Sequence, residues 1–110
     1  MKAAALYRVS TKKQVKGEDG SIAVQQVLVR KYAAEHGYDL VREYVEPGVS
    51  AYKLSYQERD IFQDALQDAL AGEYEVLLVF KADRLSRNAL EYPTVLWQLN
   101  QAGVEVISVS

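Results

Sequence analysis

The stretch Glu75–Phe80, which reads EVLLVF, is the part of the chain that decides its fold. Its last five residues are all apolar, with no alternation of apolar and polar positions. An uninterrupted apolar run of this length is typical of a strand that is covered on both faces, as the inner strands of parallel sheets are. We therefore expect a central strand here, with helices packed on both sides of it.

Three further stretches have the composition of strands, at residues 3–7, 40–45 and 104–109. The segments between the four strands are long enough to hold a helix each, so neighbouring strands run parallel. The predicted class is α/β, with an open, mainly parallel sheet of four or more strands and helices on both faces. With 110 residues, 49% of them hydrophobic, the chain builds one core and forms a single domain, residues 1–110.

Helical patterns fill the three intervening segments. The first runs from Ser21 to near Gly37. The second follows the capping-box spacing of Ser55 and Glu58, and the residues of its apolar stripe are Phe62, Ala65, Leu66, Ala69 and Leu70. The third begins at Asn88, or nearer Glu91 because of Pro93, and extends to about Ala102, before Gly103. The alternation of strand and helix is thus unbroken.

Composition excludes several classes of protein. The chain has no cysteine and one histidine, His36, so we expect neither a disulfide framework nor a metal site. The formal net charge of −2 argues against a broad basic face for DNA. The apolar N-terminal run is broken by Arg8, so it is neither a signal peptide nor a membrane span. We expect a cytoplasmic protein without a membrane partner.

Polar residues collect where the predicted strands end. In open α/β sheets, ligands bind at the carboxyl ends of the strands, so the loops after the first three strands should share one edge. A hydroxyl among guanidinium groups suits attack on a phosphodiester, whereas acyl transfer would need a base that no histidine supplies. The residues that the pattern brings to this edge are Arg8, Ser10, Ser50, Lys81, Asp83, Arg84, Ser86 and Arg87.

Each of these residues also has a plainer interpretation. A serine after a strand is more often a turn or capping residue, an arginine at a strand end is usually solvated, and Asp83 with Arg84 could form a loop salt bridge of small energetic value. Their convergence on one sheet edge favours a phosphate site over these separate explanations.

The same residues resemble the catalytic domain of the serine recombinases, which include resolvases, invertases and integrases. The resemblance covers nearly the whole chain in order, and it is strongest toward large integrases and transposon recombinases. The segments that carry it are Tyr7–Thr11, Ser21–Gln25, Gly48–Ala51, Arg59 with Phe62, and Lys81–Asn88, which contains Asp-Arg-Leu-Ser-Arg.

The resemblance implies that Ser10 attacks a scissile phosphate and forms a 5′-phosphoserine link to DNA, without metal or other cofactor. Arg8, Arg84 and Arg87 would bind the phosphate and Asp83 would orient an arginine or transfer a proton, while the supporting residues would be Gln25, Ser50, Arg59 and Lys81. The implied partners are double-stranded DNA sites and further copies of the recombinase, as a dimer or tetramer. The chain is expected to stop short of a long dimerisation helix and a DNA-binding region, and to be inactive alone.

Two other functions stay open at this point. The domain could be a catalytically silent module that pairs with full-length recombinase subunits. It could also be a small-molecule phosphatase or nucleotide-binding domain, although the phosphate-loop pattern GxxxxGK[ST] is absent.

Overall fold

The computed structural model describes residues 1–8, 22–46, 60–81 and 92–110. Four strands form one sheet in the order β2-β1-β3-β4, and every neighbouring pair is parallel. The bounds of the strands are β1 Lys2–Arg8, β2 Asp39–Glu46, β3 Val76–Val79 and β4 Glu105–Ser108. The predicted class, an open parallel α/β sheet, is confirmed.

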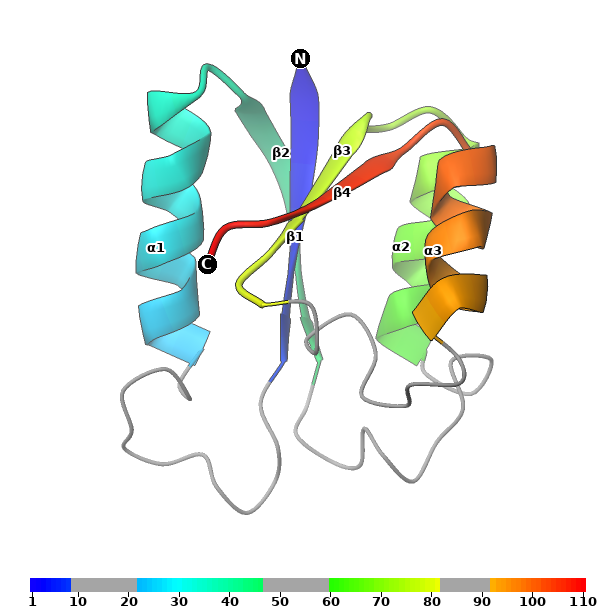
Figure 1. The fold of residues 1–110 in the computed structure, drawn as a ribbon, viewed down its shortest axis with the longest axis horizontal. Coiled ribbons are helices and arrows are strands. Elements are labelled where there is room, and N and C mark those ends of the chain that lie inside the picture. The colour runs from blue at the N-terminus through cyan, green and yellow to red at the C-terminus, as the bar shows by residue number, and fades with distance from the viewer. Residues whose placement is uncertain (9–21, 47–59, 82–91) are drawn as a thin grey trace.

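Three helices cover the two faces of this sheet, with α1 on one face and α2 and α3 together on the other (Figure 1). The chain steps from β1 outward to β2, and then back past β1 to β3 and β4. Because parallel crossovers are right-handed, this reversal of direction sends α1 to the opposite face from α2 and α3. The bounds of the helices are α1 Ile22–Glu35, α2 Asp60–Leu70 and α3 Tyr92–Gln101.

Glycine ends α1 and α3 where the sequence predicts a stop. Gly37 and Gly103 have φ angles of 75° and 87°, a left-handed conformation that costs glycine little. After α1, the Tyr38 amide donates to the Ala33 carbonyl at 2.9 Å, which closes the last turn of the helix. Each helix can therefore turn sharply into the following strand.

The inner strands supply most of the core. In β3 all four residues are buried, and β1 is buried from Ala3 to Arg8. Side chains alternate between the two faces, so Leu6 and Leu77 pack with α2 and α3, whereas Ala5 and Leu78 pack with α1. The prediction that Glu75–Phe80 holds a strand covered on both faces is confirmed.

One residue of the predicted apolar stripe in α2 does not join this core. Phe62, Ala65 and Ala69 are buried, but Leu70 is 67% exposed. Leu70 is the last residue of α2, and the chain turns away directly after it. The helical period alone does not show where a helix runs past the sheet.

The edge strand β2 contains a bulge that changes which side chains face which helix. Ala3 pairs with Leu40 and Ala4 pairs with Arg42, so Val41 is an extra residue. Beyond the bulge, Glu43 lies beside Ala5 on the α1 face, and the neighbouring positions face α2. This register decides the polar contacts described below.

Candidate functional site

The carboxyl ends of β1, β2 and β3 lie at one end of the sheet (Figure 1). The last described residues there are Arg8 after β1, Glu46 after β2 and Lys81 after β3. Between β1 and β3 the order of the strands reverses, because the chain leaves β1 for one side of the sheet and returns to β3 on the other. Such a switch point is where open α/β sheets bind ligands.

Three of the predicted site residues, Arg8, Gln25 and Lys81, are described by the structure. The other predicted residues lie outside the described ranges: Ser10, Ser50, Arg59, Asp83, Arg84, Ser86 and Arg87.

Arg8 is a buried cation at the end of β1, with 1% of its surface exposed. It shares the face of Leu6, two residues earlier, and its register partner on β2 is Glu46, which is also buried. Burying a charge is costly unless charged or polar groups compensate it. The solvated strand-end arginine considered from sequence does not describe this residue.

Gln25 holds the main chain at Arg8. Its side chain is fully buried in the first turns of α1, and its Nε2 donates to the Arg8 carbonyl oxygen at 3.0 Å. The Arg8 amide donates in return to Oε1 of Gln25 at 3.4 Å. The side-chain amide of Gln25 thus bonds to both the main-chain N–H and the main-chain carbonyl of Arg8, two positions before Ser10.

Lys81 follows the end of β3, two residues after Val79. The register between β1 and β3 ends where Leu6 pairs with Val79, and the chain bends at Phe80 and Lys81. The Nζ of Lys81 is 5.4 Å from the ring centroid of Phe80, a cation–π distance. Two of the predicted cations, Arg8 and Lys81, thus come at or directly after the carboxyl ends of neighbouring strands.

A polar cluster that was not predicted from the sequence includes Tyr7, the residue before Arg8, on the face of the sheet that α1 covers. The Tyr7 hydroxyl donates to Glu43 Oε2 at 2.6 Å, and Arg30 on α1 donates to both carboxylate oxygens of Glu43 at 2.8 Å. The hydrogen bonds from Arg30 lower the pKa of Glu43, and burial together with this carboxylate raises the pKa of Tyr7. We call Tyr7, Glu43 and Arg30 the α1-face triad.

A second cluster of the same chemistry lies on the opposite face. The Tyr44 hydroxyl donates to Asp68 Oδ2 at 2.6 Å, and Arg42 Nε lies 3.8 Å from the same oxygen. Arg42 also donates to Glu73 at 3.3 Å. We call Tyr44, Asp68 and Arg42 the α2-face triad; it joins α2 to β2.

A known protein family and several solved structures match this chain. The family model described as the N-terminal domain of resolvase matches residues 3–110. The chain belongs to the resolvase family. It is a resolvase-like catalytic domain of the site-specific recombinases, so the resemblance seen in the sequence motifs is confirmed. No curated protein sequence matches it.

Solved structures agree with this membership of the resolvase family. The domain is similar to the N-terminal catalytic domain of TP901-1 integrase, with a TM-score of 0.86 and 29% identity over 99% of this chain and 78% of that one. It is also similar to a resolvase family site-specific recombinase from Streptococcus pneumoniae, with a TM-score of 0.76 and 31% identity over 97% and 71%. The catalytic domain of the IS607-like recombinase ISC1926 TnpA, at 23% identity, shares the fold with a TM-score of 0.82, over 100% of this chain and 68% of that one.

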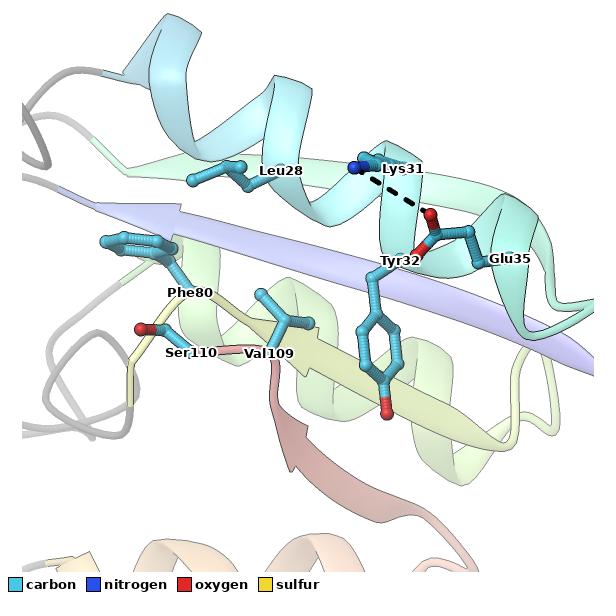
Figure 2. A pocket seen from close by; sticks show the side chains of 7 residues that line it. All are labelled: Leu28, Lys31, Tyr32, Glu35, Phe80, Val109 and Ser110. Carbon is cyan, nitrogen blue, oxygen red and sulfur yellow. Dashed lines mark ion pairs between the residues drawn. The ribbon is translucent and has the colours of Figure 1, made fainter.

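The resolvase domain also has a shallow groove between α1 and the ends of β3 and β4 (Figure 2). Its lining is largely apolar, and its one cation, Lys31, forms an ion pair with Glu35 at 3.8 Å. The lining residues are Leu28, Lys31, Tyr32, Glu35, Phe80, Val109 and Ser110. Neither Arg8 nor Gln25 lines it, so the groove is distinct from the site at the switch point.

The part of the chain that the structure describes has neither a metal-binding cluster nor a membrane-spanning helix. Within residues 1–8, 22–46, 60–81 and 92–110, no three acidic or histidine side chains are grouped as a metal site would need. In the same ranges, no helix is both long enough and apolar enough to cross a membrane.

Proposed function

We propose that this resolvase domain cleaves and rejoins DNA through a covalent intermediate on Ser10. The Ser10 hydroxyl gives up its proton as its oxygen attacks a scissile phosphate, the bond between phosphorus and serine oxygen forms, and the bond from phosphorus to the 3′ oxygen breaks. The leaving oxygen takes a proton and becomes a 3′-hydroxyl, and the phosphate stays on the serine as a 5′-phosphoserine link. Reversal with a new 3′-hydroxyl rejoins the strand, so the number of phosphodiester bonds is conserved and no cofactor is required.

The observation that carries this proposal is the buried Arg8 at the switch point, with its main chain held by Gln25. Gln25 fixes the main chain from which the Arg8 guanidinium extends. A cation positioned before the reaction stabilises the charge that develops on phosphate oxygens with little reorganisation during it. Arg8 precedes Ser10 by two residues. The two hydrogen bonds from Gln25 to the main chain of Arg8 therefore restrict the position of the chain that leads to Ser10.

The remaining roles belong to the same proposal. Arg84 and Arg87 bind the phosphate together with Arg8, and Asp83 orients an arginine or transfers a proton. Lys81 contributes positive charge from the segment after β3, and Ser50 and Arg59 support the binding of the phosphate. Planar guanidinium groups suit this task because their donors match pairs of phosphate oxygens.

The proposed substrate is double-stranded DNA that carries a recombination site. Strand exchange needs at least two cleaved duplexes, so we propose that a dimer or tetramer performs it. Selection of the DNA sequence by a region outside residues 1–110 is also part of the proposal, since the domain has a formal net charge of −2 and no excess of basic residues.

The test is the Ser10→Ala variant of the whole protein as its gene encodes it. The probe is duplex DNA from the ends of the DNA element that carries the gene, and covalent complexes are separated on a denaturing gel. Wild-type protein should form complexes that survive denaturation and Ser10→Ala should form none, because the nucleophilic oxygen is gone. Thr11→Ala is the matched control and should keep forming them; complexes with Ser10→Ala would refute the proposal.

A further inference from the structure

We propose that the α1-face triad is a positioning device for the nucleophile segment, in which Glu43 fixes α1 and its Gln25 against the end of β1. This inference rests on the proposed role of Ser10. It assigns Tyr7, Glu43 and Arg30 a part in the reaction although none of them contacts the phosphate.

Helix α1 is attached to β1 at two consecutive residues, Tyr7 and Arg8. Gln25 binds the main chain of Arg8 directly. Arg30 reaches the side chain of Tyr7 through the carboxylate of Glu43. Helix α1 therefore has two polar attachments to β1, one at the strand end and one through Glu43, which lies level with Ala5.

Apolar packing of Val29 and Ala33 holds α1 on the sheet, but apolar contacts are not directional. Among the polar contacts, Gln25 alone would leave small tilts of α1 about that point unopposed. Arg30 lies five residues further along α1, about 7.5 Å at the rise of an α-helix. Two attachments at that separation oppose such tilts, and reaction rates respond steeply to misplacement, with about 100-fold lost for roughly 1 Å.

One carboxylate oxygen of Glu43 links Tyr7 to Arg30. Oε2 of Glu43 accepts from the Tyr7 hydroxyl at 2.6 Å and from Nε of Arg30 at 2.8 Å. Tyr7 is fully buried, so its hydroxyl has this carboxylate in place of water. Removal of the hydroxyl therefore removes the side-chain link between Tyr7 and Glu43 and leaves the surface ion pair of Glu43 and Arg30 intact.

The α2-face triad supplies a matched control within the same domain. Its Tyr44 hydroxyl makes a bond of the same length, 2.6 Å, to a carboxylate that also lies near an arginine. None of its three members belongs to β1 or α1. Loss of the Tyr44 hydroxyl should therefore lower the free energy of unfolding by a similar amount without disturbing the hydrogen bonds between Gln25 and the main chain of Arg8.

The experiment compares Tyr7→Phe with Tyr44→Phe in the whole protein, with the same element-end DNA probe. We expect Tyr7→Phe to form the covalent complex about tenfold more slowly at saturating DNA, with DNA affinity unchanged. Tyr44→Phe should react at the wild-type rate. Hydrogen exchange of the Arg8 amide should be faster in Tyr7→Phe and unchanged in Tyr44→Phe, which tests the positioning independently of activity.

Arg30→Gln is a second variant, on the solvent side of the triad, and should slow complex formation in the same direction. The inference is overturned if Tyr7→Phe keeps the wild-type rate and the wild-type exchange at Arg8 while Ser10→Ala forms no complex; the proposed function would then stand. Equal slowing by Tyr7→Phe and Tyr44→Phe would also overturn it, because the effect would follow stability alone. Complexes formed by Ser10→Ala would instead overturn the proposed function.

Discussion

The α1-face and α2-face triads have the same three kinds of side chain, but they are attached to different parts of the fold. Tyr7, Glu43 and Arg30 tie α1 to the strand end that precedes Ser10, whereas the other triad ties α2 to the edge strand. Both tyrosines have a raised pKa, with burial as the largest cause. The chemistry of such a cluster therefore does not reveal its role, and its position in the sheet does.

The two triads also differ in how tightly the arginine is held. Arg30 donates to both oxygens of Glu43 at 2.8 Å, a fork geometry that fixes the guanidinium plane. Arg42 is divided between two acids, at 3.8 Å from Asp68 and 3.3 Å from Glu73. The arginine is thus held more tightly in the α1-face triad, which contains Tyr7, the residue before Arg8.

The largest effect in this comparison is expected at Gln25, the attachment that α1 makes directly to the main chain of Arg8. Gln25→Leu keeps much of the side-chain volume but leaves buried polar groups of Arg8 without the amide. We expect complex formation to fall about 100-fold and the free energy of unfolding to fall by about 2 kcal/mol. Denaturant titration and the rate of covalent complex formation measure the two quantities.

Tyr74→Phe is the matched control for this variant on the other face. The Tyr74 hydroxyl is buried and donates to the Ala65 carbonyl of α2 at 2.6 Å. Its loss should cost about 1 kcal/mol of stability, with the rate of complex formation unchanged. If both variants changed the rate in proportion to their stability, the distinction between the two faces would be wrong.

A smaller effect is expected from the charge of Glu43. Its folded-state pKa lies below the ordinary 4.5, chiefly because of Arg30, so its contribution to stability is complete above that value and declines as pH falls through the folded-state pKa. Glu43→Gln should lower the free energy of unfolding by about 1 kcal/mol at neutral pH, the upper part of the range for partly exposed pairs. The difference from wild type should vanish in acid.

Denaturant titrations of wild type and Glu43→Gln between neutral pH and about pH 3, below the ordinary range for a glutamate, measure this difference. A difference that stayed constant over that range would show that the carboxylate charge does not hold the α1-face triad together. The account would then have to rely on packing of Tyr7 alone.

The fold could be predicted from sequence because its signals are local. The apolar run Val76–Phe80, the stops at Gly37 and Gly103 and the alternation of strand and helix each follow from a few neighbouring residues. The exposure of Leu70 could not be predicted, because it depends on where α2 runs past the sheet.

For the candidate site, position after a strand suggested Arg8 and Lys81, and motif resemblance suggested Gln25, whose bond to the Arg8 main chain no periodicity reveals. Their part in the reaction stays a prediction. Glu43 was missed because the bulge at Val41 reverses the facing of the residues after it, so a simple alternation from Leu40 assigns them to the wrong sides. A local sequence pattern does not reveal this register, because it depends on pairing with a strand that is distant in the sequence.

The most direct measurement of the central claim is the mass of the peptide that carries DNA. Trypsin cuts after Arg8 and Lys12, so it would release Val9–Lys12, a peptide that contains both Ser10 and Thr11. After covalent complexes are trapped and the DNA is digested, we predict a nucleotide mass on this peptide, with fragmentation placing it on Ser10. A nucleotide on Thr11, or on any other peptide, would contradict the account.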